Sequence, residues 1–446
     1  MAKSEPVGLL ERRFELSARG TDLRTEILAG ATTFLTMAYI ALVNPAVLGQ
    51  AGMPVAAVAA ATCLAAGFAS ILMGFMANVP LALAPGMGLN AYFSFTVVQA
   101  MGVPWPVALG CVFISGLAFL VLTFAGVRQL IIAAIPPHLF AAVAGGIGLF
   151  IALIGLKNAG IVVTSPATSV TLGDLHAPGA ALALFGLIVT AALAAWKLRG
   201  AILIGIAATT LAGWISGQVS FTPQPYDLGA IRETAFQLDL AGVLGLSGSH
   251  GLGLFEILFV FLFVDLFDNI GTLVGVTRRA GLIDEQGRVP KLNRILFTDS
   301  IATIFGSLAG TSTVTSYVES AAGVQAGGRT GLTAIVTGLL FLAMMFVAPY
   351  AQLVPLAATA PALILVGALM MAPLADIEWD KAEIAIPAFL TLAMIPLTFS
   401  IANGLAFGIT AYALLKLLLG EIKRSDWLLL LLAVLFVARF AWLSAE

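Results

Sequence analysis

The sequence predicts an all-α polytopic membrane protein with fourteen transmembrane segments in a seven-plus-seven inverted repeat. Of its 446 residues, 60% are hydrophobic and only 10% are charged, and the mean hydropathy is +1.05. A soluble domain carries about 25% charged residues, so this chain lacks the side chains to cover a water-facing surface. Long apolar runs follow one another, and two are interrupted at matching places. A soluble enzyme, a nucleic-acid binder and a disordered chain are excluded.

Apolar runs long enough to cross a membrane occur in two groups. A spanning helix needs about 20 mostly apolar residues. Seven such runs precede a polar stretch at 219–253, and seven follow it. The first seven lie near 27–48, 55–77, 82–99, 104–126, 138–156, 178–197 and 199–218. The second seven lie near 254–275, 291–309, 311–325, 329–349, 354–372, 383–400 and 403–420. A last run, 427–443, either forms a fifteenth span or lies at the interface.

Positive charges predict the orientation. Lys and Arg gather in the N-terminal tail and in the loops after even-numbered spans, which is typical of cytoplasmic segments. Lys423 and Arg424, after span fourteen, fall on the same side. The acidic loop 373–382 fits poorly, but acidic residues count little in this rule. The N-terminus is therefore expected in the cytoplasm, and it has no signal-peptide pattern.

Two spans are predicted to be broken. Span three contains a proline and two glycines within 84–90, which a continuous helix tolerates badly. Span ten is rich in Thr, Ser and Val over 310–319, which suits an extended strand. Such backbone survives at membrane depth only where protein or a cavity satisfies it. We expect free amide groups at Gly86, Gly88 and 311–317.

The spacing of the breaks indicates a repeat. Asp265 follows Met37 by 228 residues (265 − 37), and Glu319 follows Asn90 by 229 (319 − 90). Seven is odd, so two seven-span halves have opposite topology. Inverted repeats with broken helices at matching positions are typical of transporters with a site between the breaks. A coincidence of loop lengths is the alternative.

Three carboxylates lie inside apolar spans. Each costs roughly 2.5–3.5 kcal/mol there, so Asp265, Asp268 and Glu319 require an explanation. Asp265, Asp268 and Thr272 share one helix face, which must look inward. Glu319 is expected to accept hydrogen bonds from N–H groups of a ligand. No Lys or Arg lies near these acids in sequence, so they are candidates for coupling to H⁺ or Na⁺. Alternatively, they only pair with Thr, Ser or backbone amides and fix the packing.

Asn90 either reads the edge of a polar heterocycle or caps the half-helix that follows. In the first role, Asn90 and the free amides donate to the acceptors of the ligand. Tyr92, Phe93 or Phe263 is expected to stack on its ring. The three histidines are scattered, and Cys63 and Cys111 are isolated, so we expect no metal and no cofactor.

Six stretches, which together extend over nearly the whole chain, resemble the AzgA-like purine permeases of the nucleobase–ascorbate (nucleobase/cation symporter) group. They are 25–40, 84–93, 259–275, 311–331, 360–370 and 386–400. The resemblance implies a core domain of spans 1–4 and 8–11 and a gate domain of spans 5–7 and 12–14. The implied division is a cytoplasmic tail (1–26), core (27–126), gate (127–218), an extracellular or periplasmic connection (219–253), core (254–349), gate (350–420) and a C-terminal segment (421–446).

The resemblance also implies proton-coupled uptake of adenine, guanine or hypoxanthine by a homodimer in the cell inner (plasma) membrane. Asn90, Asp265 and Glu319 match the binding residues of the family, and Asp268 is close behind. Asn269 departs from the pattern, because a Thr or Ser is expected there. The predicted substrate contacts are Asn90, Phe93, Asp265, Thr315, Ser316 and Glu319. The predicted ion-coupling residues are Asp265, Asp268 and Glu319.

Three alternatives remain open from the sequence. The first is a uracil or xanthine carrier of the same fold. The second is an anion exchanger or channel of the related seven-plus-seven architecture, which acids at the site disfavour. The third is a membrane-embedded enzyme, for which the sequence offers no nucleophile–base or metal constellation.

Overall fold

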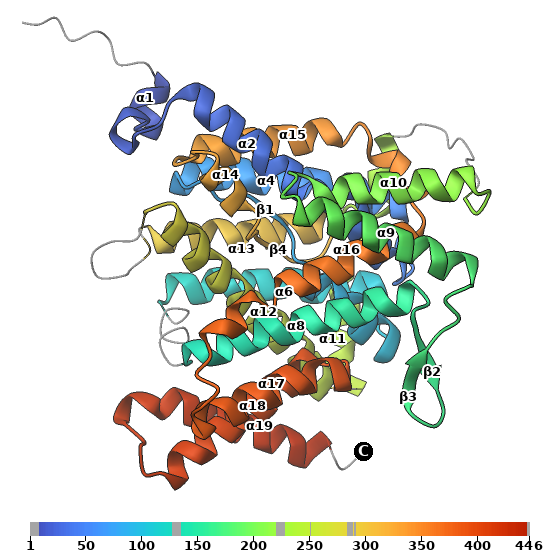
Figure 1. Ribbon diagram of the computed structural model, residues 1–446. Coiled ribbons are helices and arrows are strands. Elements are labelled where there is room, and N and C mark those ends of the chain that lie inside the picture. The colour runs from blue at the N-terminus through green and yellow to red at the C-terminus, as the bar shows by residue number, and fades with distance from the viewer. Residues whose placement is uncertain are drawn as a thin grey trace, which may run out of the picture.

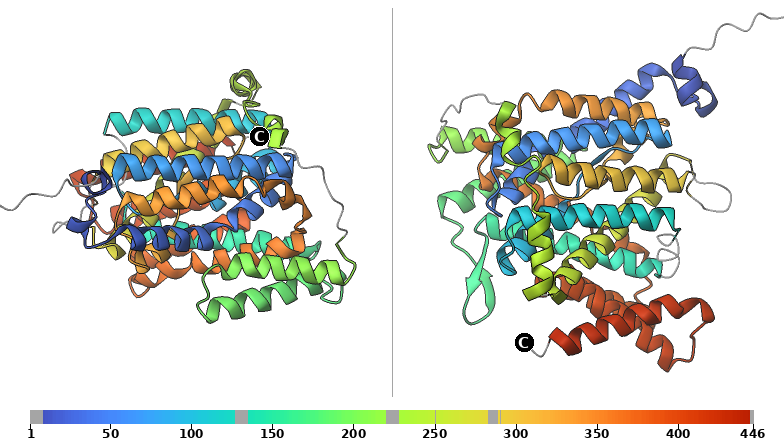
Figure 2. Two further views of the ribbon diagram at one scale, coloured as in Figure 1. Left: turned by 90° about the horizontal axis from the view of Figure 1, so that it is seen from above. Right: turned by 180° about the vertical axis from the view of Figure 1, so that it is seen from behind.

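The computed structural model describes residues 9–126, 135–219, 228–249, 251–282, 289 and 291–443. Most of its helices lie side by side in one bundle, with α1 (Leu9–Phe14) at one end and the hairpin of β2 (Val162–Ser165) and β3 (Ser169–Leu172) at the opposite end (Figures 1 and 2). The all-α membrane architecture predicted from the sequence is confirmed. The hairpin, within 157–177, was not predicted.

The first half of the chain forms two long helices, a short strand and then further long helices. Its other elements are η1 (Ser17–Arg19), α2 (Leu23–Met37), α3 (Ile40–Gly49), α4 (Val55–Ala77), β1 (Leu83–Pro85), α5 (Met87–Ala91), the π-helical η2 (Tyr92–Ala100), α6 (Trp105–Phe124), α8 (Pro137–Asn158), α9 (Pro178–Ala195) and α10 (Ala201–Ile215).

The second half repeats this order. Its elements are η3 (Leu228–Glu233), α11 (Leu240–Ser249), α12 (Gly251–Arg279), α13 (Leu292–Ala309), β4 (Val314–Ser316), α14 (Ser320–Gln325), α15 (Gly331–Met344), η4 (Ala348–Leu353), α16 (Leu356–Leu369), η5 (Ala372–Asp376), α17 (Ala382–Thr398), α18 (Ile401–Leu418), η6 (Arg424–Asp426) and α19 (Trp427–Leu443).

Within the described residues, seven helical segments are long and apolar enough to cross a membrane, and five shorter apolar helices accompany them. The run 427–443 forms one of the shorter ones, α19. The number of fourteen spans and the division into core and gate stay predictions.

Both predicted breaks are present and pair with each other. β1 and β4 lie in the middle of the bundle (Figure 1) and form an antiparallel pair with Ala84 opposite Thr315. The ladder continues beyond the strands, because Gly86 N–H donates to the oxygen of Thr313 at 2.9 Å and Tyr317 N–H to that of Ala82 at 3.0 Å. The expectation of free amides at Gly86 and at position 317 is therefore wrong: the opposite break accepts from them.

The packing follows the symmetry of an inverted repeat. α4 packs against α15, and their counterparts α13 and α6 pack against each other. In the same way α9 packs on α16 and α17 on α8, while α10 contacts α2 and α18 contacts α12. Small residues permit the closest contacts. A Cβ atom on Gly148 of α8 would lie 2.6 Å from the carbonyl oxygen of Gly367 in α16.

Two segments predicted as peripheral are partly inside the bundle. In the stretch 219–253, η3 and α11 form, and α11 packs against α6 and α12 with Val243 fully buried. In the tail 1–26, Glu26 belongs to α2 and is fully buried. Its carboxylate accepts from backbone N–H groups of Arg329 at 2.8 Å and Thr333 at 3.1 Å, at the start of α15. A carboxylate is favourable there, because the first amides of a helix lack partners within it.

Candidate functional site

Glu319 lies at the junction of the second break, immediately before α14, and is half-buried. The hydroxyl of Tyr39 donates to its Oε1 at 2.7 Å. Tyr39 lies between α2 and α3, where the helical pattern of the first span is interrupted. A carboxylate accepts about four hydrogen bonds. Tyr39 therefore orients Glu319 and leaves most of the accepting capacity of this carboxylate available.

Asp265 lies in α12 and is fully buried, so its own side chain faces inward as predicted, while the orientation of the whole face that it shares with Asp268 and Thr272 stays a prediction. α12 packs against β4, α14 and α5, which brings this helix beside both breaks. Four residues further along, Asn269 is also fully buried, and neither atom of its amide has a hydrogen-bond partner among the described residues. The side chain of Asp268 lies outside the part that the structure describes.

Asn90 lies in α5, fully buried, and belongs to a polar network. Its Nδ2 donates to Oδ1 of Asn44 in α3 at 2.6 Å, and its Oδ1 accepts from the hydroxyl of Ser312. Asn44 donates in turn to Thr62 in α4 and to Thr311. The alternative that Asn90 caps the half-helix is wrong, because it is the fourth residue of that helix.

The strand of the second break carries buried hydroxyl groups. Thr315 and Ser316, both predicted contacts, are at most 2% exposed, and so is Thr313. None of the three hydroxyl oxygens has a hydrogen-bond partner among the described residues. A buried polar group without a partner costs about 1–3 kcal/mol, so these hydroxyls can each gain stability from a hydrogen bond to a ligand.

Aromatic rings surround the two breaks. Phe93 is fully buried, and Tyr92 meets Phe261 of α12 edge-on with ring centroids 5.3 Å apart. Phe263 stacks on Phe259 at 4.1 Å. One face of Phe263 is therefore covered by a protein ring, which leaves at most its other face for a flat ligand.

Comparison with known proteins gives the family. A family model, Xan_ur_permease, described as "Permease family", matches residues 24–420. The chain belongs to this family. The family resemblance drawn from the sequence is confirmed, and the chain is a membrane permease and not an enzyme.

Named relatives of this permease cover nearly its whole length. It is 46% identical over 439 residues to the adenine permease AdeP of Escherichia coli (strain K12), covering 98% of this chain and 97% of AdeP. It is 45% identical over 440 residues to the guanine/hypoxanthine permease PbuG of Bacillus subtilis (strain 168), covering 97% and 99%.

A solved structure shares the fold. The transmembrane domain of the cyanobacterial bicarbonate transporter BicA aligns with a TM-score of 0.62 at 16% identity, covering 92% of this chain and 97% of BicA's. At this identity the likeness concerns the fold alone.

Sequence reasoning missed three polar residues of the permease's interior: Tyr39, Asn44 and Asp299. Asp299 is a fully buried carboxylate in α13, and the cost argument applied to Asp265 covers it equally. Tyr39 and Asn44 carry no such signal, because a neutral phenol or amide does not incur the cost of a charge inside the membrane.

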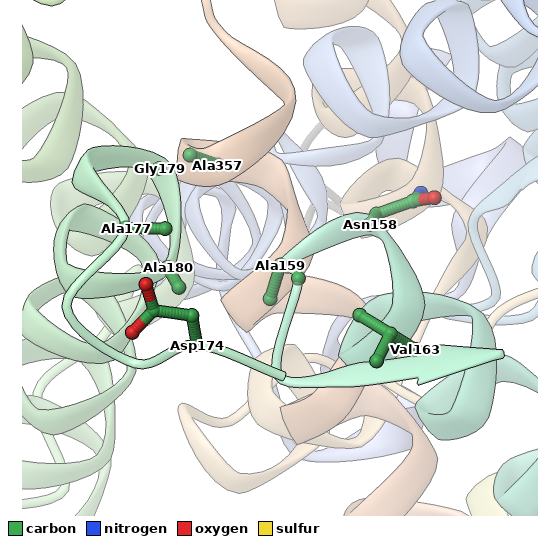
Figure 3. A pocket seen from close by; sticks show the side chains of 9 residues that line it. Asn158, Ala159, Val163, Asp174, Ala177, Gly179, Ala180 and Ala357 are labelled. Carbon is green, nitrogen blue, oxygen red and sulfur yellow. The ribbon is translucent and has the colours of Figure 1, made fainter. Parts of the chain in front are cut away.

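A hollow of about 360 Å³ lies elsewhere, at the end of the bundle that carries the β2–β3 hairpin (Figure 3). Its lining includes Asn158, Val163, Asp174 and Ala357. None of the predicted contacts lines it, so it is not the site formed by the breaks. Among the described residues, no group of three or more His, Cys, Asp or Glu side chains could hold a metal ion.

Proposed function

We propose that this permease is a secondary active transporter that imports purine nucleobases by proton symport. Relatives that match it over nearly their whole length are named adenine permease and guanine/hypoxanthine permease. Adenine, guanine and hypoxanthine are therefore the proposed substrates. No cofactor takes part.

The observation that carries the proposal is the half-buried carboxylate of Glu319 between β4 and α14, oriented by Tyr39. A purine is flat and presents N–H groups along its edges. Glu319, with Asp265 on the adjoining α12, is the proposed acceptor for these groups. Thr315, Ser316 and Asn90 supply further polar contacts, and Phe93 supplies aromatic surface. A substrate without a matching group leaves one of these side chains unpaired, which is how such a site discriminates.

Acids inside the membrane supply the proposed coupling. Asp265, Asp268 and Glu319 have no Lys or Arg within several residues along the chain. Binding a proton from outside and releasing it inside neutralises such an acid for part of the cycle. Each proton that enters brings about 2.3 kcal/mol per 100 mV, enough for roughly fifty-fold accumulation.

The proposed movement is a displacement of the core domain against the gate. α12 of the core contacts α8 and α18 of the gate. Glycines in 141–148 of α8 permit close, sliding contacts between helices. We place the protein in the cell inner (plasma) membrane as a homodimer, with its N-terminus in the cytoplasm.

Uptake by cells that lack their own purine carriers tests the proposal. Labelled adenine, guanine, hypoxanthine, xanthine and uracil are compared at two pH values. Saturable purine uptake that stops when the proton gradient is collapsed supports it. Uptake that persists in a sodium gradient alone assigns Na⁺ as the coupling ion instead. Uptake of uracil or xanthine in preference to adenine, guanine and hypoxanthine, or a current in liposomes without nucleobase, contradicts it.

A further inference from the structure

We propose that Thr62 and Asn44 are positioning residues that turn the amide of Asn90, so that Asn90 offers a ligand an acceptor and not a donor. The proposal concerns the site described above and rests on the proposed function, because it assumes a purine ligand between the two breaks. It reverses the expectation that Asn90 donates to the ligand.

The direction of the network begins at Thr62. Its hydroxyl donates to the carbonyl oxygen of Val58 in the preceding turn at 2.6 Å, which uses its single proton. Oγ1 of Thr62 can then only accept, and it accepts from Nδ2 of Asn44 at 2.7 Å. The same nitrogen donates to Oγ1 of Thr311 at 2.9 Å. Both N–H groups of Asn44 are therefore used.

The orientation of the Asn44 amide determines the orientation of the Asn90 amide. Its oxygen is the atom left to face Asn90, and it accepts from Nδ2 of Asn90 at 2.6 Å. The nitrogen of Asn90 also lies 4.0 Å from Sδ of Met87, a weak acceptor. A reversed Asn90 would bring two carbonyl oxygens together and leave Ser312 facing an N–H group. The orientation follows from the donors and not from the shape of the amide, which is nearly symmetrical.

One N–H group of Asn90 bonds to Asn44 and the second faces the sulfur of Met87, so the strongest remaining capacity of Asn90 lies on its oxygen. A carbonyl oxygen has two lone-pair directions, and the hydroxyl of Ser312 occupies one. The second accepts an N–H group. Asp265, Thr315 and Ser316 are as deeply buried as Asn90, so burial does not separate Asn90 from the rest of the site; its hydrogen bonds do. With Glu319, the site then reads two N–H groups of one ligand.

Two competing ligands of nearly the same shape test whether the oxygen or the nitrogen of the Asn90 amide faces the ligand. The 7-deaza and 9-deaza forms of one purine have the same outline but carry the five-membered-ring N–H on opposite edges. Their inhibition constants against labelled purine uptake give a ratio for each variant of the full-length permease. We expect wild type to prefer one form by about tenfold, since the other leaves the second lone-pair direction of the Asn90 oxygen without a donor.

Thr62→Val removes the hydroxyl at nearly constant volume, so Asn44 and Asn90 are free to turn. The ratio of the two inhibition constants should change by threefold or more, either approaching a value of one or reversing the preference. Thr62→Ser restores the hydroxyl and should restore the ratio. Thr190→Val is the matched control, because the hydroxyl of Thr190 bonds only within its own helix among the described residues, to Gly186 at 2.6 Å, in α9. It should leave the ratio as in wild type.

Ser312→Ala keeps the test decisive if Thr62→Val does not reach the membrane. Asn44 still orients Asn90 in this variant, so the ratio should keep its wild-type direction. A ratio that Ser312→Ala abolishes overturns the proposal, as does a wild-type ratio near one or a Thr62→Val ratio equal to that of Thr190→Val. Absence of saturable purine uptake by wild type is a different result, because it rejects the proposed function itself.

Discussion

The two breaks of the bundle have the same outline, a short strand followed by a short helix, but they use their polar groups differently. At the first break, Asn90 exchanges hydrogen bonds with Asn44 and Ser312. At the second, Thr315 and Ser316 keep hydroxyls without a partner among the described residues, and Glu319 is half-buried.

The difference indicates that the second break makes most of the contacts with a ligand, while the first break mainly supports the structure. A ligand adds hydrogen bonds only where capacity is left, and most of that capacity lies at the second break. The first break supports it: β1 pairs with β4, and the hydroxyl of Tyr317 donates to the carbonyl oxygen of Pro85. Loss of the side chains that keep hydrogen-bonding capacity should therefore impair transport most, and loss of the hydrogen bonds that hold the two breaks together should impair stability most.

The largest effect is expected for Glu319→Gln. It removes the charge and replaces one acceptor by a donor, so the initial rate of purine uptake should fall about hundredfold or more. The rate is measured against the amount of protein in the membrane. Glu378→Gln is the control, since Glu378 is exposed and pairs with Lys381 outside the bundle. Normal uptake by Glu319→Gln would remove Glu319 from the site.

The next effect is a loss of stability in Asn44→Leu. The N–H of Asn90 loses its acceptor in the buried network, at a cost of about 1–3 kcal/mol. The midpoint of heat-induced aggregation in detergent should fall, while Glu319→Gln stays near wild type. Equal midpoints for Asn44→Leu and wild type would contradict the supporting role of the first break.

Two tyrosines give a smaller, paired contrast. Tyr39→Phe removes the donor that orients Glu319, so KM for purine should rise by about three- to tenfold with little change in heat stability. Tyr317→Phe removes the donor to Pro85 and should lower heat stability by about 1 kcal/mol with a smaller change in KM. Kinetics and melting curves of both variants are compared, and a reversed pattern would contradict the site role of Tyr39 and the structural role of Tyr317.

The smallest effect provides the baseline. Asp22 is exposed and caps the N-terminus of α2, and the backbone N–H of Thr25 lowers the pKa of its carboxyl below the ordinary value of 3.8. The folded pKa is below the unfolded one, so the contribution is present above the unfolded value and is lost as pH falls through the folded pKa. Asp22→Ala should melt slightly earlier at neutral pH, with the gap closing in acid, and KM should not change. A changed KM would show that any loss of stability reaches the site.

Part of the site could be predicted from the sequence, because the features that determine it lie in a few neighbouring residues. The proline and glycines of 84–90 and the Thr-rich stretch 310–319 predicted both breaks, and the cost of a buried charge predicted that Asp265 faces inward. Tyr39 and Asn44 could not be found in this way. Glu26 was assigned to the tail, because sequence position alone does not reveal that the start of α15 covers it.

By itself the sequence determined the membrane class, the two interruptions and the acids that accompany them, because hydropathy, backbone conformation and charge cost are properties of a few neighbouring residues. The tertiary structure alone decided which polar groups are used and which remain available. Asn44 and Thr311 are 267 residues apart along the chain and bond at 2.9 Å, and the direction of every amide in that network depends on such contacts.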